Sequence, residues 1–148
     1  MPTTCPFCRI LNDELPSSRV VEDEHVVAFL DIHPVAQGHT LVVPRRHVES
    51  FTDLSSDEVA QLAQAGRLVA AHLKLVVEGC EGISLTLADG ESAGQDVPHV
   101  HLHVIPRRRG DGFGWKLPPG YGLQAAPRDQ LDSVAALVRD SIRSRRGL

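Results

Sequence analysis

The chain has 148 residues, of which 42% are hydrophobic and 23% are charged, a composition typical of an ordinary globular protein. The formal net charge of −4 gives no overall field that would favour a nucleic-acid partner. The start "MPTTCPFC" lacks the basic and apolar regions of a signal peptide, and no apolar run approaches the roughly 20 residues of a membrane span. We therefore expect a cytoplasmic protein without a membrane partner.

The first half of the chain predicts two strands and a long helix. Residues 26–32 and 39–44 are short apolar, β-branched runs joined by a connector of hairpin length, so we expect two strands. Residues 55–79 follow the helical period of apolar side chains, which predicts a helix. Ser55 and Glu58 fit a capping box at its start.

The second half predicts two more strands and a final helix. Residues 82–88 and 99–106 alternate as strands, and 128–143 show an apolar helical stripe. We expect an α+β fold, an antiparallel sheet with a long helix and a C-terminal helix. The whole chain, 1–148, is expected to be one domain, with a core over about 5–113 and a C-terminal loop and helix over 114–148.

Three histidines, His99, His101 and His103, alternate with apolar residues in "HVHLHV". On a strand, this spacing puts the three imidazoles on one face. At about 3.3 Å per residue, the outer two lie about 13 Å apart, which is too far for one zinc ion unless the strand bends. We therefore expect the three histidines to have different tasks.

A neutral imidazole with one free nitrogen is a competent nucleophile, and phosphorus is a natural target for it. The loop before the histidines contains Gly90 and Gly94, which allow backbone N–H groups to approach an anion closely. This combination points to chemistry on a phosphate group.

The pair Cys5-x-x-Cys8 has the spacing of two zinc ligands. A redox pair or two buried cysteines are the alternatives. With His47 and His99 the pair would complete a closed Cys₂His₂ site, which would be structural and hold zinc. The third cysteine, Cys80, is interpreted as a small apolar residue.

The residues resemble the histidine triad family of nucleotide hydrolases and transferases. "HVHLHV" resembles the family's His-x-His-x-His motif, and the similarity extends over about residues 5–113 through "CPFCRI", "VVAFLDIHPVAQGHTLVVPRRH" and "DGESAGQDVPHVHLHVIPR". The stretch "ESFTDLSSDEVAQL" resembles the fragile-histidine-triad branch, whose substrates are dinucleoside polyphosphates. The "CPFC" start resembles bacterial members that bind zinc.

The resemblance implies a role for each histidine of the site. His101 would attack the α-phosphorus and form a nucleotidyl-histidine intermediate, with its other nitrogen held by the carbonyl of His99. His103 would donate to a phosphate oxygen or the leaving group, and His39 would contact the same groups. The resemblance also implies a homodimer that forms through the long helix and pairs the sheets of two subunits.

The same resemblance assigns the nucleotide contacts. Asp31 would accept hydrogen bonds from the ribose. The other expected contacts are an apolar slot for the base, made by Phe7, Ile10, Phe29 and Ile32, and a phosphate lining made by Gly94, Gln95 and Asp96. The base is expected to be adenine, so the product would be AMP.

Two positions depart from the family pattern. Ala88 stands where Asn or Gln is usual, and Asp96 stands where a hydroxyl is common. These changes leave two substrate classes open: dinucleoside polyphosphates such as diadenosine tri- or tetraphosphate, and nucleoside phosphoramidates. The alternatives to a hydrolase with a histidine nucleophile are a non-catalytic, zinc-stabilised dimeric module that binds purine nucleotides, and a metallohydrolase that uses the triad as ligands.

Overall fold

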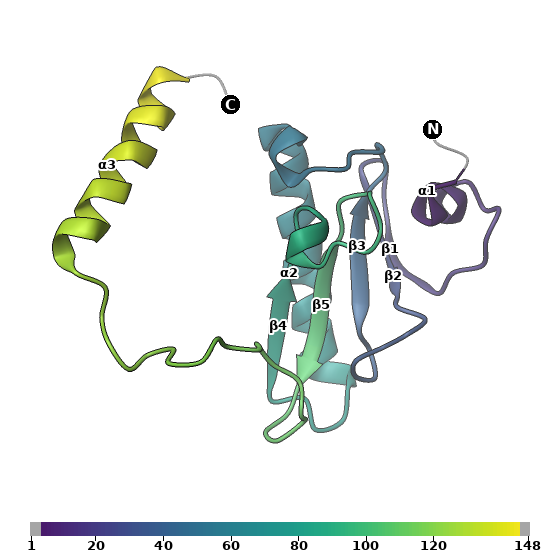
Figure 1. Cartoon of the computed structure of the whole chain (residues 1–148). Helices are drawn as coiled ribbons and strands as arrows, with labels where there is room; N and C mark the ends of the chain where they lie inside the picture. Colours follow the sequence, from purple (N-terminus) through teal and green to yellow (C-terminus); the bar gives the residue numbers. More distant parts are fainter. Residues whose placement is uncertain (1–3, 146–148) are drawn as a thin grey trace. The chain divides into compact units, whose positions relative to one another are not determined.

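The computed structural model describes residues 4–145. It divides into two compact units between Phe113 and Gly114. The first unit is built on a five-stranded sheet in the order β1-β2-β3-β5-β4, and each neighbouring pair is antiparallel (Figure 1). The strands are β1 (Arg19–Glu22), β2 (Val26–Leu30), β3 (Thr40–Pro44), β4 (Gly82–Thr86) and β5 (Leu102–Arg107).

The helices are α1 (Pro6–Leu11), α2 (Ser56–Val76) and α3 (Arg128–Ser144), with short 3₁₀ turns η1 (Phe51–Asp53) and η2 (Glu91–Ala93). The expected α+β fold is confirmed. Among the described residues, no helix is long and apolar enough to cross a membrane. Whether the two units fold as one domain, and whether two sheets pair in a dimer, stay predictions.

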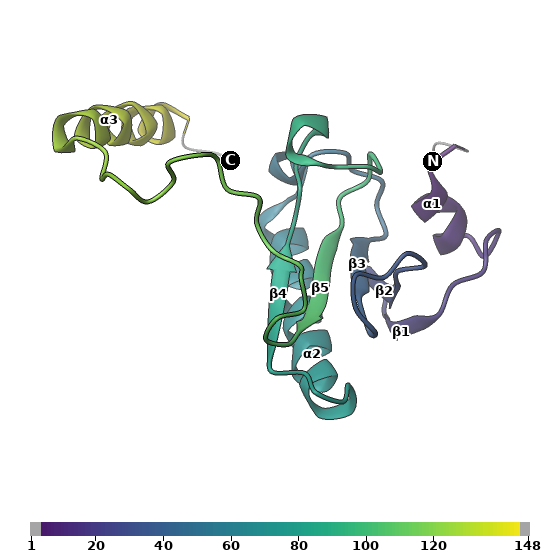
Figure 2. The ribbon, with the colours of Figure 1, turned by 60° about the horizontal axis from the view of Figure 1, so that its bottom comes forward.

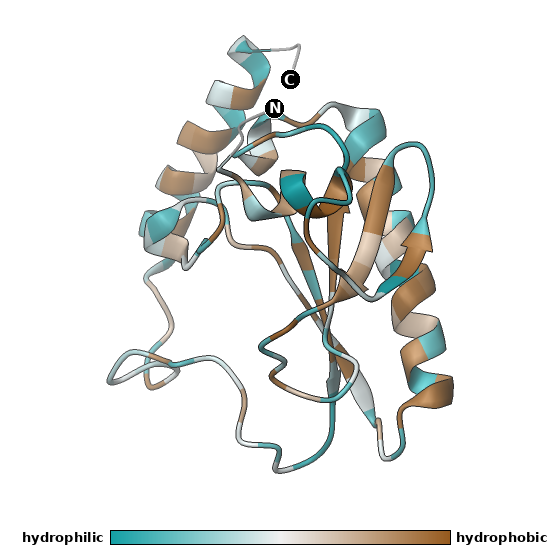
Figure 3. Cartoon of the chain, turned by 90° about the vertical axis from the view of Figure 1, so that its right-hand side faces the viewer, coloured by the Kyte–Doolittle hydropathy of each residue, from teal (hydrophilic) through white to brown (hydrophobic). Residues whose placement is uncertain are grey.

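The sheet has a hydrophobic core on each face. On one face α2 packs on β2, β3 and β5 through residues such as Val26, Val42 and Val104. On the other face α1 packs through Phe7 and Leu11 on the opposite side chains of β2 and β3 (Figures 1 and 2). Because both faces are covered, β2 and β3 are almost continuously buried, and hydrophobic colouring runs along strands of the sheet in Figure 3.

The long helix begins as the sequence predicts. The Ser55 hydroxyl accepts a hydrogen bond from the Glu58 N–H at 3.2 Å, and the Glu58 carboxylate accepts from the Ser55 N–H at 2.8 Å, so the capping box is confirmed. Farther along, a Cβ added to Gly66 would lie only 2.7 Å from Leu102 Cδ2. This glycine lets the helix lie directly on β5, the strand that carries His103.

Three of the four predicted strands are confirmed with ends shorter by one or two residues. The prediction for 99–106 is wrong at its start, because β5 begins at Leu102. The β3–β5 register pairs Val42 with Leu102, and continuing it would set Pro44 opposite Val100. Proline has no N–H for the ladder, and Val100 instead donates to the carbonyl of Val48 at 2.7 Å.

The alternation of faces nevertheless extends past the end of the strand. Val100 packs in the core under α2 with Val104. The rings of His99 and His101 lie on the opposite side, with centroids 5.9 and 5.1 Å from the ring of Phe7. The prediction that the histidines share one face therefore agrees with the structure, although two of them precede the regular strand.

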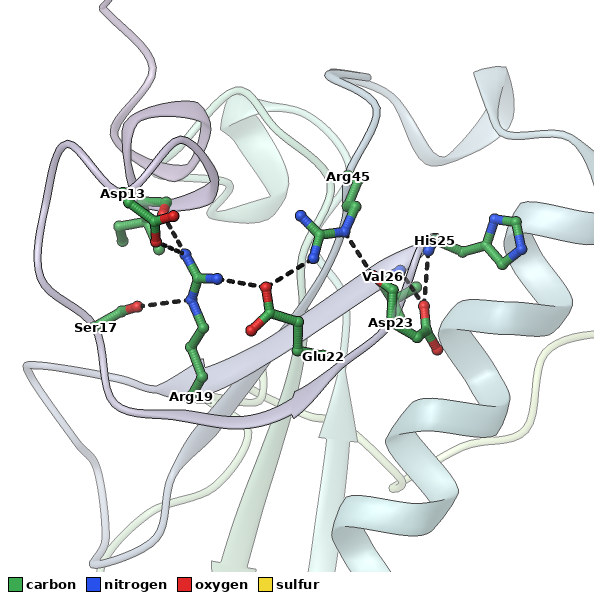
Figure 4. Close-up of polar contacts among 9 residues, drawn as sticks. Asp13, Ser17, Arg19, Glu22, Asp23, His25, Val26 and Arg45 are labelled. Atoms are coloured by element: carbon green, nitrogen blue, oxygen red, sulfur yellow. Dashed lines mark hydrogen bonds and ion pairs between the residues drawn. The ribbon is translucent and has the colours of Figure 1, made fainter.

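The sequence patterns missed α1 and β1, which a polar network joins (Figure 4). Arg19 donates to the Ile10 carbonyl at 2.7 Å, to Asp13 at 2.6 Å and to Glu22 at 2.6 Å. Arg45 reaches the same Glu22 carboxylate at 2.9 Å, and these cations lower the pKa of Glu22. The network ties the end of α1 to the sheet and positions the segment between them.

The second unit contains α3, which confirms the predicted terminal helix within one residue at its end. Its apolar residues Leu131, Val134, Val138 and Ile142 are all exposed. Hydrophobic and hydrophilic residues alternate along it in Figure 3. Most helical stability in proteins comes from packing of an apolar face, so this stripe is suited to covering another apolar surface.

Candidate active site and metal cluster

Four sequence-predicted ligands, Cys5, Cys8, His47 and His99, converge beside α1. The two cysteines come from the first turn of α1, His47 follows β3, and His99 precedes β5. Their ligand atoms all lie within 4.8 Å of one another. The His47 Nδ1 to His99 Nδ1 distance is 3.3 Å, and the sulfur–nitrogen distances are 3.3 Å (Cys8–His47), 3.6 Å (Cys5–His99) and 3.7 Å (Cys8–His99).

These distances match the edges of a zinc tetrahedron. Bonds of about 2.0–2.1 Å to nitrogen and about 2.3 Å to sulfur give edges of about 3.3 Å between nitrogens and about 3.6 Å between sulfur and nitrogen. His99 Nε2–H donates to the carbonyl of Pro44 at 2.8 Å. That bond fixes the neutral tautomer and leaves Nδ1 with a free lone pair toward the cluster.

The electrostatics of the cluster also favour a cation. Burial lowers the pKa of His99 to about 4, so the imidazole is neutral at pH 7. Burial and the neighbouring Cys5 raise the pKa of the Cys8 thiol to about 11, so a nearby positive charge is needed for Cys8 to become a thiolate near pH 7. The residues fit a closed, four-ligand metal, and thiolates with imidazoles favour zinc over magnesium or calcium.

The two remaining triad histidines, His101 and His103, lie side by side, with ring centroids 5.0 Å apart. His101 is only 2% exposed, and its Nδ1–H donates to the carbonyl of His99 at 2.7 Å. In the neutral form of the ring, the lone pair is therefore at Nε2. This nitrogen faces the slot and lies 3.3 Å from a carboxylate oxygen of Asp96.

His39 and His103 form a hydrogen-bonded relay. The Val35 N–H donates to His39 Nδ1 at 3.1 Å, so neutral His39 has its proton at Nε2, which donates to His103 Nδ1 at 2.9 Å. His103 must then hold its own proton at Nε2, as a donor. Burial lowers the pKa of both His39 and His103, which keeps the rings neutral near pH 7.

Asp31 joins this relay, with a carboxylate oxygen 3.6 Å from His39 Nε2. These three side chains are close enough to hold a metal, but the hydrogen bonding argues against one. A metal on His39 Nε2 would need the proton at Nδ1, where the Val35 N–H already donates. The hydrogen bonds of this cluster therefore favour protons over a metal ion at its ring nitrogens, in contrast to the cysteine cluster.

An apolar slot of about 440 Å³ opens beside His101 and His103. Eight of the predicted residues line it: Phe7, Ile10, Phe29, Asp31, Ile32, Asp96, His101 and His103. Phe7 and Phe29 stack edge to face at 5.6 Å and also belong to the core, whereas Ile32 is 83% exposed. Sequence analysis missed Leu15, Pro16, Leu41 and Val97, because the first two lie in a loop and the others read as core.

His39 does not line the slot. It is 3% exposed, both of its ring nitrogens are hydrogen-bonded, and one of these bonds joins it to His103, which lines the slot. The expected direct contact of His39 with phosphate is not the geometry seen here. The side chain of His99 belongs to the cluster with Cys5, Cys8 and His47, and its backbone carbonyl is the part that contacts His101.

In the loop that contains Gly90 and Gly94, the backbone N–H groups of both glycines are already hydrogen-bonded, so they are not free to bind an anion. The Gly90 N–H donates to the Gln95 side chain at 2.7 Å, and the Gly94 N–H donates to the Glu91 carbonyl at 2.9 Å. The Gln95 amide group donates to the Glu49 and Val97 carbonyls at 2.8 and 3.1 Å. Gln95 therefore braces the loop. Within residues 4–145, the N–H of Asp96 has no acceptor and stays free to bind an anion.

Comparisons of this chain with known proteins agree with this geometry. The family model for the HIT domain matches residues 12–110. The chain belongs to the histidine triad family. An uncharacterised HIT-like protein of Methanocaldococcus jannaschii is 46% identical over 108 residues, which cover 73% of this chain and 82% of the relative.

Two solved members of the histidine triad family bear on the site. A zinc-bound histidine triad family protein from Mycobacterium smegmatis has a TM-score of 0.72 and 38% identity, over 88% of this chain and 97% of the other. A histidine triad nucleotide-binding protein from Candida albicans has a TM-score of 0.83 and 28% identity, over 95% and 99%.

Proposed function

We propose that this protein is a nucleotide hydrolase that cleaves at the α-phosphate through a covalent intermediate on His101. The observation that carries the proposal is the orientation of that ring. Its Nδ1–H is held by the His99 carbonyl at 2.7 Å, and its Nε2 lone pair faces a slot that also contains a carboxylate and a proton donor. The nucleotide-binding relative from Candida albicans supports the substrate class.

In the first step, His101 Nε2 attacks the α-phosphorus and a P–N bond forms. The bond from phosphorus to the leaving group breaks, and the leaving group takes the electron pair while His103 Nε2–H donates a hydrogen bond to it; a leaving amine takes its proton from solvent. In the second step, water attacks the phosphorus and its proton passes to solvent. The P–N bond then breaks, its electron pair returns to Nε2, and a nucleoside monophosphate is released.

The protein contributes positioning and hydrogen bonds to both steps. The His39–His103 bond at 2.9 Å fixes the tautomer that donates to the leaving group. The Asp96 N–H is free to bind a non-bridging oxygen of the phosphate. This arrangement stabilises charge where it develops at the phosphorus.

Nucleotide recognition follows from the slot. The rings of Phe7 and Phe29 with the side chains of Ile10 and Ile32 line its apolar part, which suits a nucleotide base. One Asp31 oxygen accepts from the His33 N–H at 2.8 Å. The other faces the relay and could accept from ribose hydroxyls.

Zinc, when bound by Cys5, Cys8, His47 and His99, would supply a structural cross-link and no open position for substrate. It would join α1, the end of β3 and the segment before β5. Since Phe7 lies in the same helix and the His99 carbonyl orients His101, the metal would hold the slot and the nucleophile in register. The zinc-bound relative from Mycobacterium smegmatis supports this assignment.

We also propose a homodimer. Leu68, Leu75 and Val76 of α2 are exposed, and α2 borders an apolar hollow of about 350 Å³ shared with Val20 and Leu30. Strand β4 lies at the edge of the sheet, where a second sheet could pair. Light scattering after size exclusion should give twice the monomer mass, and Leu75→Glu should lower it.

The direct test is turnover of diadenosine triphosphate, diadenosine tetraphosphate and an adenosine phosphoramidate by the parent and by His101→Ala. We expect a measurable rate for the parent and a loss of at least about 10³-fold in the variant. The fastest substrate identifies the branch. A parent that binds AMP but hydrolyses none of the three, with His101→Ala binding equally well, would instead identify a nucleotide-binding module.

A further inference from the structure

Asp96 stands between two hollows of the first unit. One is the apolar slot with His101, and the other is a polar hollow of about 780 Å³ lined by Glu49, Ser50, Asp89, Gly90, Glu91, Gln95, Asp96 and Pro98. Asp96 lines both. If a nucleoside fills the slot and its phosphorus meets His101, the polar hollow is the adjoining space for the rest of the substrate.

The polar hollow carries only negative charge. Four carboxylates line it, from Glu49, Asp89, Glu91 and Asp96, and no lysine or arginine is among its lining residues. Sites for polyphosphates ordinarily contain such cations, because their N–H groups neutralise and bind phosphate oxygens. A polyphosphate tail would find no such partner in this hollow.

Asp96 differs from the other three carboxylates in its contact with the nucleophile. Its Oδ1 lies 3.3 Å from His101 Nε2, at the place that the α-phosphate must enter. Asp89, by contrast, is turned away and accepts from Ser50 Oγ at 3.2 Å and from the Phe51 N–H at 3.1 Å. The Asp96 side chain is 78% exposed, so it can rotate to admit a substrate but stays beside it.

We propose that Asp96 is a specificity-determining residue that selects substrates by the charge of the group beyond the α-phosphate. It disfavours nucleotides that extend into further phosphates, and it favours those whose α-phosphorus is bonded to an amine that is neutral or carries an ammonium group. This inference rests on the proposed function. It also agrees with the position of His103, because a departing amine nitrogen accepts a hydrogen bond from His103 Nε2–H and takes its proton from solvent, whereas a phosphate departs as a stable anion.

The reaction that this selects is the hydrolysis of a P–N bond. The nucleotidyl group passes to His101 Nε2, the amine departs with the electron pair and a proton from solvent, and water then releases the nucleoside monophosphate. The amine that leaves gains a positive charge when it binds a second proton from solvent. The carboxylates of the polar hollow would stabilise that cation.

The test compares Asp96→Asn with Glu91→Gln, which removes the same charge from the same hollow without a contact to His101. The substrates are diadenosine triphosphate and adenosine 5′-(2-aminoethyl)phosphoramidate. We expect the ratio of their kcat/KM values to shift toward the polyphosphate by about tenfold in Asp96→Asn, and by less than about threefold in Glu91→Gln. High salt should reduce the shift.

An unchanged ratio in Asp96→Asn, or an equal shift in both variants, would overturn the inference while leaving the hydrolase intact. If the parent hydrolyses neither substrate, the proposed function fails, and binding then decides about Asp96. In calorimetry with AMP and ATP, Asp96→Asn should tighten ATP relative to AMP by about tenfold. An equal ratio of ATP affinity to AMP affinity in the parent and in the variant would reject charge selection as well.

Discussion

Two clusters of histidines lie at the two ends of one short segment, and they differ in where their protons are. At the His99 end, two sulfurs and two Nδ1 atoms face one another at 3.3–3.7 Å, and the His99 proton is held on the far side of its ring by Pro44. At the His103 end, a backbone N–H starts a chain of donors through His39.

A histidine side chain is therefore suited to be a metal ligand or a hydrogen-bond donor according to the hydrogen bond that its other ring nitrogen makes with the backbone. A carbonyl partner at Nε2 exposes a lone pair at Nδ1, as in His99. An N–H partner at Nδ1 sends the proton out through Nε2, as in His39. The first cluster is therefore suited to hold a cation, and the second to move a proton.

The largest expected effect comes from breaking the metal cluster. Cys5→Ser with His47→Ala should abolish bound zinc and lower the free energy of unfolding by at least about 2 kcal/mol, because metal binding is coupled to folding. Metal analysis and denaturant unfolding measure both. Cys80→Ser is the matched control, since Cys80 lies outside the cluster and should retain zinc. Normal zinc occupancy in the double variant would rule out the Cys₂His₂ assignment.

The second effect comes from breaking the relay without touching the metal. His39→Asn should lower kcat by about 10- to 100-fold and leave zinc content unchanged. The loss should be largest for an amine leaving group, which needs a proton, and small for a leaving group that departs as a stable anion. His25→Asn, at an exposed position outside both clusters, is the control. An equal loss with both kinds of leaving group would mean that His39 is only structural.

The third effect concerns the second histidine ligand. His47 Nε2 is buried without a hydrogen-bond partner among the described residues, and the nearest charge is a Glu49 oxygen at 3.7 Å. Glu49→Gln should weaken zinc affinity by about tenfold, because carboxylates behind ligating histidines strengthen the metal bond. Competition with a chelator measures this. Unchanged affinity would show that Glu49 does not support His47.

The smallest effect is a dependence of stability on pH that arises from the relay. Burial lowers the folded pKa of His39 and His103 below the ordinary 6.5, so the unfolded chain binds more protons just below pH 6.5. The contribution of these two histidines to the free energy of unfolding should therefore be fully present above about pH 6.5. It should fall as the pH decreases, by at most about 1.4 kcal/mol per pH unit for each proton.

In the variant His39→Gln, the slope of the free energy of unfolding against pH should decrease by up to the amount that one bound proton contributes. The contribution of the metal cluster should stay the same. Unfolding in denaturant at several pH values between 5 and 7.5 measures it. Equal slopes in the parent and in His39→Gln would contradict a relay of neutral histidines.

Much of this arrangement was predictable from the sequence because the signals are local or periodic. The apolar period defines α2, Ser55 and Glu58 mark its start, and the residues Cys5, Cys8, His47 and His99 carry the chemistry of a zinc site. The long-range contacts were not predictable. The Val35 N–H on His39, the Pro44 carbonyl on His99 and the Arg19 network depend on backbone positions that no side-chain pattern records.

The boundary errors have physical causes of the same kind. A six-residue helix at Pro6–Leu11 and a four-residue strand at Arg19–Glu22 contain too few periods to stand out. The strand expected from His99 begins only at Leu102, since Pro44 interrupts the ladder. The contact of Asp96 with His101 could be expected from neither period nor motif, because a strand pattern does not say where a loop carboxylate folds back.

The most direct test of the account is to trap the covalent intermediate. The parent would be mixed with an adenosine phosphoramidate, quenched during turnover under conditions that preserve phosphohistidine, digested and analysed by mass spectrometry. We expect an adenylyl group on His101 and on no other histidine, and no such group in His101→Ala. Turnover by the parent with no adduct, or with the adduct on another residue, would contradict it.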